Sequence, residues 1–194
     1  MAKLYFHYSS MNAGKSTALL QANHNYLERG MNALLFTAKL DDREGSGVIS
    51  SRIGIKKEAL AFGQDDNLLE ITKSEHAKSS LHCIFVDEAQ FLSKIQVRLL
   101  SKIADELNIP IMCYGIRTDF QGKLFEGSSE LLAIADNLKE LKTICSMCDK
   151  KATMVVRLNA DGEVMLEGKK VMIGGNDIYK TLCRKHFREI TKLI

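Results

Sequence analysis

The stretch Ser9-Ser10-Met11-Asn12-Ala13-Gly14-Lys15-Ser16 lies between an apolar run, residues 4–8, and a helical pattern that begins at Thr17. A strand, a loop ending in Gly-Lys-Ser and a helix, in that order, form the arrangement that holds the phosphates of a nucleoside triphosphate. Backbone N–H groups of the loop and the positive end of the helix converge on the phosphate oxygens. The stretch therefore predicts a phosphate-binding loop.

Two side chains of this loop have expected tasks. Lys15 would reach the β- and γ-phosphates, and the Ser16 hydroxyl would bind Mg²⁺. The loop departs from G-x-x-x-x-G-K-[ST] at its first position, where Ser9 replaces glycine. Ser9 would strain the loop if that position needs a positive φ, but we expect binding to persist because backbone N–H groups form most of the cradle. The alternative is a chance Gly-Lys-Ser at the start of an ordinary helix.

The surrounding pattern predicts an α/β fold with a parallel sheet. A helix over residues 17–29 leads to the continuously apolar run Ala33–Ala38, which is typical of a strand buried on both faces. Residues 39–57 are polar and glycine-containing, which predicts a long functional or mobile loop. Further patterns predict strands at 83–87 and 109–115, and helices at 65–79, 93–107 and 131–141.

Composition limits the possible classes of protein. The 194 residues, 45% hydrophobic and 26% charged, suit one sizeable soluble domain or a domain with a small appendage. The net charge of +3 is small and its cations are scattered, so we expect no nucleic-acid partner. The sequence has no apolar run long enough for a membrane span and no signal-peptide pattern at the start, and a cytoplasmic location is expected.

Two adjacent acids, Asp87 and Glu88, follow the apolar run at residues 83–86. A strand that ends in an acid beside a phosphate loop supplies the carboxylate that holds Mg²⁺, directly or through water. Asp87 is the better metal acid because it ends the run, and Glu88 is then free to face a substrate hydroxyl. The alternative is a pair of solvated carboxylates before the helix over residues 93–107.

Two aromatic residues, Phe120 and Phe125, follow the strand at 109–115 in a loop that contains Gly122. Ligands of open α/β sheets bind at the carboxyl edge of the strands. These rings could stack on a flat substrate, and packing of the loop onto the core is an equally good interpretation.

The cysteines divide into two groups. Five is an odd number, which argues against a disulfide framework, and two of them lie in apolar runs as expected for buried residues. The other three form a C-x-x-C and a C-x-x-H pair that match a closed tetrahedral Zn²⁺ site, with reduced free thiols or a redox pair as alternatives. The predicted zinc ligands are Cys145, Cys148, Cys183 and His186. We read this site as structural, and predict a core domain at 1–141 and a zinc-binding domain at 142–194.

Between the two zinc pairs, a predicted strand at 170–173 ends in Gly174-Gly175, and Tyr179 follows. Glycines let the backbone approach a ligand closely, although an ordinary hairpin turn would look the same. The inventory favours a small-molecule kinase with Glu88 as base and the zinc lobe as a lid. A GTPase would normally carry Asn-Lys-x-Asp, which is missing from the sequence. The alternative is a zinc-bearing RecA-like ATPase that acts on nucleic acid.

At this point the chain resembles the zinc-containing thymidine kinase family of bacterial type. Besides the phosphate loop and the zinc pairs, the matching stretches are Asp42-Arg43, Ser51-Arg52-Ile53-Gly54, Val86-Asp87-Glu88-Ala89-Gln90-Phe91, Tyr114-Gly115-Ile116-Arg117-Thr118-Asp119-Phe120 and Ile173-Gly174-Gly175-x-x-x-Tyr179. The match spans nearly the full chain, and the order and spacing of the motifs are specific.

The resemblance implies a P-loop NTPase fold of the RecA-like kind, whose zinc lobe carries a lasso loop. It implies transfer of the ATP γ-phosphoryl to the 5′-hydroxyl of thymidine in nucleoside salvage, with deoxyuridine as a plausible second substrate. Glu88 would be the base, with Arg43 and Lys15 as further catalytic groups. A homotetramer inhibited by thymidine triphosphate is also expected.

The implied binding residues fall into two sets. The ATP-binding set is Ser9, Ser10, Met11, Asn12, Ala13, Gly14, Lys15, Ser16, Asp87, Glu88, Ala89 and Gln90, of which Ser16 and Asp87 hold Mg²⁺. The thymidine-binding set is Met11, Phe91, Phe120, Phe125, Lys170, Val171, Met172, Ile173, Gly174 and Tyr179, where residues 170–174 would read the base through their backbone.

Overall fold

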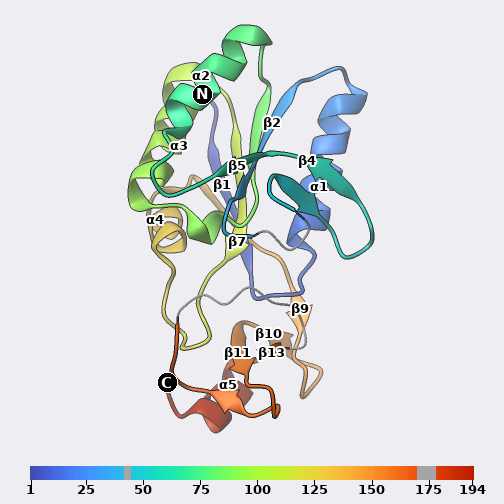
Figure 1. Ribbon diagram of the computed structural model, residues 1–194, viewed down its shortest axis with the longest axis vertical. Coiled ribbons are helices and arrows are strands. Elements are labelled where there is room, and N and C mark those ends of the chain that lie inside the picture. Colours follow the sequence, from blue (N-terminus) through green and yellow to red (C-terminus); the bar gives the residue numbers. More distant parts are fainter. Residues whose placement is uncertain (42–44, 170–177) are drawn as a thin grey trace.

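A parallel sheet forms the centre of the protein in this computed structural model, which describes residues 1–41, 45–169 and 178–194 (Figure 1). Six strands make the sheet, and every neighbouring pair is parallel, as predicted. In spatial order they are β5 (Leu60–Phe62), β2 (Ala33–Ala38), β6 (Cys83–Val86), β7 (Ile111–Ile116), β1 (Leu4–Ser9) and β8 (Asn137–Glu140).

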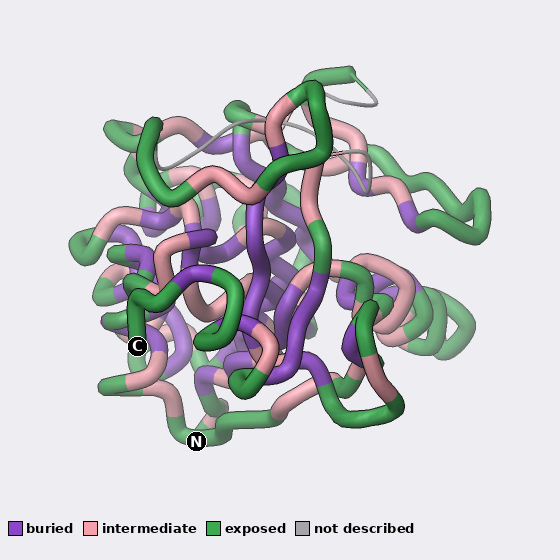
Figure 2. Tube along the Cα trace, turned by 90° about the horizontal axis from the view of Figure 1, so that it is seen from below, coloured by how far each residue is buried: buried purple, intermediate pink, exposed green. Residues whose placement is uncertain are grey.

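Helices cover both faces of the sheet. One face packs against α1 (Lys15–Glu28), and the other packs against the three helices α2 (Leu68–Lys78), α3 (Lys94–Leu107) and α4 (Glu126–Ile134) (Figure 1). Alternate residues of β2 serve the two cores, since Leu34 and Phe36 face the three-helix side and Leu35 faces α1. The central strands are therefore buried along their length (Figure 2).

The predicted long loop at 39–57 contains a regular element that the pattern did not reveal. A two-stranded antiparallel ribbon, β3 (Val48–Ser50) with β4 (Lys56–Glu58), lies beyond residue 47. Ile49 is buried against the core on the α1 side. The polar composition hid the ribbon because β4 is exposed at all three positions and only one residue of β3 is buried.

The predicted helix at 131–141 is wrong in its position. The helix α4 ends at Ile134, and the chain then forms the edge strand β8 beside β1. The Asp136 carboxylate accepts a hydrogen bond from the Leu4 backbone N–H at 2.8 Å, which ties the start of β8 to the start of β1. Tertiary pairing therefore overrides a local pattern that would also have suited a helix.

A small antiparallel lobe follows the sheet and lies at its lower end in Figure 1. Its core includes Met154, Val156, Leu182 and Phe187. Its elements are β9 (Thr143–Ile144), β10 (Lys151–Ala152), β11 (Met154–Leu158), β12 (Val164–Met165), β13 (Tyr179–Leu182) and α5 (Arg184–Thr191). The strand predicted at 170–173 lies outside the described residues. No helix within the described ranges has the length and apolar character needed to cross a membrane.

Candidate active site

The phosphate loop connects β1 to α1, as the sequence predicts. Its left-handed residues are Asn12, with φ 62°, and Gly14, with φ 72°. Asparagine is among the side chains that tolerate this region best, and glycine adopts it freely. Ser9 is the last residue of β1 and has no positive φ, so the strain considered for it does not arise. Its hydroxyl instead donates to the Ser10 carbonyl at 2.6 Å.

Lys15 lies inside the loop and is buried. Its Nζ donates to the Ser9 hydroxyl at 3.2 Å and to the Ser10 carbonyl at 2.9 Å. The loop oxygens thus hold the ammonium group on the inner side of the loop, where a positive charge favours phosphate.

Ser16 and Asp87 meet although 70 residues separate them in the sequence. The Ser16 hydroxyl donates to Asp87 Oδ2 at 2.8 Å, and Asp87 is buried at the end of β6. Burial raises the pKa of the Asp87 carboxyl, and the neighbouring Glu88 carboxylate raises it further, against the opposing effects of Ser16 and Lys15. A hydroxyl and a carboxylate at this separation offer the hard oxygen ligands that Mg²⁺ prefers, so the pair fits the predicted metal.

Glu88 follows Asp87 in an unusual backbone conformation. Its φ of 51° and ψ of 38° are left-handed, a region that non-glycine residues seldom occupy. Glu88 precedes a 3₁₀ turn, η1 (Ala89–Phe91), and its carboxylate accepts a hydrogen bond from Gln90 Nε2. The Gln90 side chain is buried, and its Oε1 accepts from the Ile116 N–H at 3.0 Å. One amide therefore joins the acid after β6 to the end of β7.

Two glycines let the 3₁₀ turn lie close to its neighbours. A Cβ added at Gly115 on β7 would stand 2.9 Å from Gln90 Oε1, and one at Gly127 on α4 would stand 2.6 Å from the Ala89 carbonyl oxygen. Real Cβ atoms do not approach other heavy atoms so closely, so a side chain at Gly127 would press on backbone atoms and one at Gly115 would displace the Gln90 amide. The turn that carries Gln90 is thereby enclosed by β7 and α4.

The predicted aromatic residues cluster in two places. Phe91 and Phe125 meet edge to face, with ring centroids 6.0 Å apart. Phe120 is 2% exposed, and the guanidinium of Arg157 stacks on its ring at 4.0 Å from the centroid. Tyr179 is half-buried on β13, directly opposite Arg157 on β11. Sequence reasoning missed Arg157, which carries no motif and looks like an ordinary strand residue.

Several predicted residues lie outside the described part of the chain. They are Arg43 of the catalytic set, and Lys170, Val171, Met172, Ile173 and Gly174 of the thymidine-binding set. Met11, in contrast, lies half-buried in the phosphate loop.

The four predicted zinc ligands come together in the lobe. The donor atoms of Cys145, Cys148, Cys183 and His186 all lie within 4.8 Å of one another. His186 Nδ1 is 3.4 Å from Cys145 Sγ and 3.5 Å from Cys183 Sγ, and the sulfurs of Cys148 and Cys183 are 3.9 Å apart. Tetrahedral zinc with ordinary bond lengths requires about 3.6 Å between S and N and about 3.8 Å between two S atoms. The group is therefore consistent with zinc binding.

The other two cysteines are buried in the main sheet, as predicted. Burial raises the pKa of the Cys83 thiol to about 12 and also raises that of Cys113. Both are thus protonated at neutral pH and act as small apolar residues.

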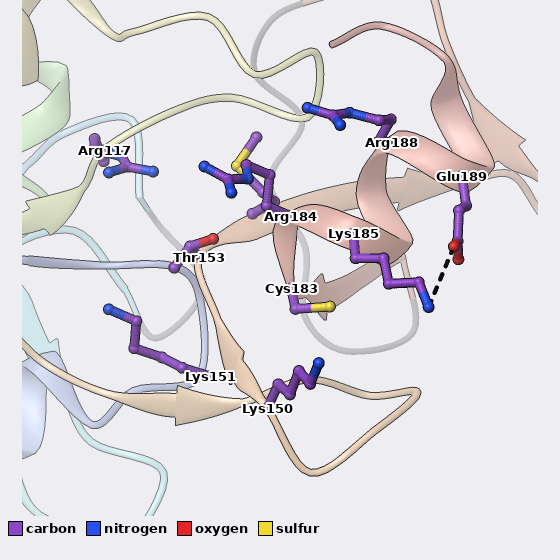
Figure 3. Close-up of a pocket in the computed structure, with 10 residues that line it drawn as sticks. Arg117, Lys150, Lys151, Thr153, Cys183, Arg184, Lys185, Arg188 and Glu189 are labelled. Carbon is purple, nitrogen blue, oxygen red and sulfur yellow. Dashed lines mark ion pairs between the residues drawn. The ribbon is translucent and has the colours of Figure 1, made fainter.

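A cationic cavity of about 660 Å³ lies where the lobe meets the core (Figure 3). Its basic side chains come from three separate segments, so the sequence shows no basic stripe: Arg117, Lys150, Lys151, Arg184, Lys185 and Arg188. Lys151 pairs with Glu140 at 2.5 Å, and Lys185 pairs with Glu189 at 3.7 Å. Most of these side chains are exposed.

The parallel sheet, the phosphate loop with its Ser16–Asp87 pair and the Cys₃His lobe define a P-loop nucleotide-binding α/β protein. The family profile described as thymidine kinase matches residues 2–187. The chain belongs to the thymidine kinase family.

Individual relatives agree with this assignment over nearly the full chain. The thymidine kinase of Shewanella oneidensis is 59% identical over 189 residues, which cover 97% of this chain and 98% of that protein. The thymidine kinase of Rhodopirellula baltica is 58% identical, with 97% and 89% covered, and that of Haemophilus influenzae is 57% identical, with 97% of each covered. Among solved structures, the replication initiator DnaA bound to AMPPCP and single-stranded DNA matches 73% of this chain and 40% of its own, with 18% identity and a TM-score of 0.43.

Proposed function

We propose that this chain transfers the γ-phosphoryl group of ATP to the 5′-hydroxyl of thymidine and so produces thymidine monophosphate. The observation that carries the proposal is the placement of Glu88 next to the Ser16–Asp87 pair at the carboxyl end of β6. The metal-binding pair would serve the donor side of the transferred phosphoryl group, and the proton acceptor would serve its acceptor side. Both therefore have to lie at the same edge of the sheet.

The phosphate loop would bind the donor. Its backbone N–H groups and Lys15 would hold the phosphate oxygens, and Ser16 and Asp87 would hold Mg²⁺. When bound, Mg²⁺ would neutralise part of the negative charge on the transferring group. Arg43 would help hold the 5′-oxygen and the phosphoryl group.

Glu88 would accept the proton of the 5′-hydroxyl as the hydroxyl oxygen attacks the γ-phosphorus. Gln90 would hold the Glu88 carboxylate toward that hydroxyl through the hydrogen bond described above. Five side chains would enclose the thymine: Met11, Phe91, Phe120, Phe125 and Tyr179. The backbone of residues 170–174 would recognise the edge of the base.

The Cys₃His group would hold a structural Zn²⁺, because four protein ligands leave no open position for chemistry. Residues 142–194 would then form a zinc-dependent domain on a core of residues 1–141. The protein would form a homotetramer in the cytoplasm. Thymidine triphosphate would inhibit it, and deoxyuridine would be a second substrate.

A panel of nucleosides with ATP and Mg²⁺ tests the activity directly. We expect thymidine monophosphate as the main product. ATP hydrolysis that single-stranded DNA stimulates, with no nucleoside monophosphate formed, would instead identify an ATPase that acts on nucleic acid.

The variant Glu88→Gln tests the base. It keeps the size of the side chain and removes its capacity to accept a proton, so we expect kcat to fall by about 10²- to 10⁴-fold. ATP affinity, measured by calorimetry, should stay the same. Glu106→Gln, at an exposed site on α3, is the matched control and should be fully active. An active Glu88→Gln enzyme would exclude Glu88 as the base.

A further inference from the structure

Arg157 carries a buried charge whose partners, within the described ranges, are all uncharged. The side chain is 1% exposed, and among the described residues no carboxylate forms an ion pair with it. Its terminal nitrogens donate to the carbonyls of Lys169, at 2.6 Å, and Glu167, at 3.3 Å. Its Nε is also buried, and no described residue forms a hydrogen bond with it. The two carbonyls and the face of the Phe120 ring therefore replace part of the hydration that this cation loses on burial.

The backbone is shaped around this guanidinium. Gly168 lies between the two accepting carbonyls and has a φ of 125°. A Cβ on Gly168 would stand 2.5 Å from one terminal nitrogen of Arg157, so any other residue here would displace the guanidinium as well as strain the backbone. The segment Glu167–Lys169 and the guanidinium thus fit closely together.

Arg157 lies beside two candidate thymidine residues on different parts of the molecule. It stacks on Phe120, which lies in the core loop after β7, and its cross-strand neighbour is Tyr179 of the lobe. Directly opposite residues of an antiparallel pair point to the same face. Beside them, Gln121 Nε2 donates to the Leu166 carbonyl at 2.8 Å and joins the same loop to the lobe.

A purely structural role would predict a different outcome on replacement. Replacing a buried ionic group by an apolar side chain of similar volume is often neutral or stabilising. If Arg157 only filled space in the lobe, a methionine would replace it equally well, and KM for both substrates would stay the same.

We propose that Arg157 is a positioning residue for the acceptor nucleoside, which fixes the Phe120 ring and the Glu167–Lys169 backbone in one arrangement across the joint between core and lobe. The inference rests on the proposed function, because it takes Phe120 and Tyr179 as thymine contacts. Arg157 acts through these neighbours, and it takes no part in donor binding or in zinc binding.

The test compares Arg157→Met and Arg157→Lys with the wild type in steady-state kinetics. We expect KM for thymidine to rise about tenfold or more in both variants, since methionine lacks the charge and lysine lacks the planar fork. KM for ATP should change by less than about twofold, and kcat should stay close to that of the wild type, as for the loss of a uniform binding contact. Zinc content should remain unchanged. Arg98→Met, at an exposed site on α3, is the matched control.

A double-variant cycle asks whether the effect passes through Phe120. Phe120→Leu combined with Arg157→Met should raise KM for thymidine no further than Phe120→Leu alone, because the two side chains act as one unit. Strictly additive effects, unchanged thymidine KM in Arg157→Met, or equal losses for ATP and thymidine would each overturn the proposal.

A measurement on the wild type keeps the proposal testable if the variants fail to fold. The Nε–H resonance of Arg157, assigned by NMR, should shift or slow its exchange when thymidine is added and stay fixed when ATP is added. A resonance indifferent to thymidine would overturn the inference. A wild type that phosphorylates no thymidine is a separate result, which would refute the proposed function itself.

Discussion

A left-handed backbone conformation and a hydrogen bond from the Gln90 amide set the position of Glu88. A left-handed conformation at a non-glycine residue costs about 1–3 kcal/mol and persists only where the surroundings enforce it. Here the surroundings are the buried Gln90 amide and the close contacts at Gly115 and Gly127. The sequence predicted Glu88 as a candidate base but gave no sign of its strained conformation, since glutamate is a poor residue for it.

Replacing Gln90 tests this support. In Gln90→Leu the Glu88 carboxylate loses a donor and the Ile116 N–H loses an acceptor, so we expect kcat to fall about tenfold or more while KM for ATP changes little. Steady-state kinetics with both substrates checks this prediction.

A second variant separates positioning from a general loss of stability. Gln90→Glu keeps the length of the side chain but places a like charge beside Glu88, so it should lower kcat further than Gln90→Leu while KM for ATP again changes little. A kcat equal to that of the wild type in both variants would contradict the role given to Gln90.

His7 provides a test of stability that is independent of the active site. It lies on β1 between Tyr114 and Lys139, its cross-strand neighbours. Burial, and then the charge of Lys139, lower the pKa of His7 to about 4. Because the unfolded chain takes up the proton near pH 6.5, stability is lost as pH falls from 6.5 to 4 and levels off below that.

We expect this loss to be on the order of 1–2 kcal/mol, after allowance for the partial exposure of His7. Denaturant unfolding at pH 7 and pH 5 measures the part of this loss that occurs above pH 5. The free energy of unfolding of His7→Gln should fall less between pH 7 and pH 5 than that of the wild type. Any contribution of the zinc lobe to the fall is the same in both proteins. Equal drops in the two proteins would show that His7 titrates normally.

At the scale of elements, the phosphate loop, η1 and the carboxyl ends of β6 and β7 form the candidate site. Strands that are apolar on both faces were predictable, because burial on two sides leaves a continuous apolar run. The edge strand β8 was not, because only one side of an edge strand pairs and its residues are mostly exposed. The ribbon β3–β4 escaped prediction for a similar reason.

The variant Gly127→Ala tests the enclosure of η1 by α4. The added methyl group would stand 2.6 Å from the Ala89 carbonyl oxygen and 2.7 Å from that of Leu92, both of them backbone atoms. We expect a loss of about 1–2 kcal/mol in the free energy of unfolding, since overpacking outweighs the higher helix propensity of alanine. The displacement of η1 should also lower kcat for thymidine.

A neighbouring position in the same helix supplies the control. Ser129→Ala, at an exposed site, should leave stability and kcat unchanged or slightly raised. If Gly127→Ala were as stable and as active as Ser129→Ala, the turn would have room to move and the enclosure would carry no functional weight.

At the scale of the whole molecule, the lobe contacts both halves of the candidate site. The Thr143 hydroxyl donates to the Asn12 carbonyl of the phosphate loop at 3.1 Å. On the acceptor side, the Arg157–Phe120 stack and the Gln121–Leu166 hydrogen bond join the lobe to the loop after β7. Loss of order in the lobe should therefore affect donor and acceptor together.

Removing a zinc ligand tests this dependence. The buried core of the lobe is small, so its folding should draw on metal binding. In Cys145→Ser we expect less than about one equivalent of zinc, a lower Tm and weaker binding of both substrates. Metal analysis, thermal unfolding and calorimetry measure the three effects.

The control is a buried cysteine outside the cluster. Cys113→Ala removes a thiol from β7 and should keep its zinc. A folded Cys145→Ser protein with a full equivalent of zinc would place the metal elsewhere.

Residue types and their spacing were enough to predict the phosphate loop, the acids after β6 and the four residues of the Cys₃His group. Each of these is a short motif that already reflects its chemistry. The folded arrangement was needed to see that Gln90 holds Glu88, that Arg157 joins Phe120 to the lobe, and that residues 137–140 form an edge strand. These features depend on hydrogen bonds and close approaches between segments far apart in the chain, which no local pattern records.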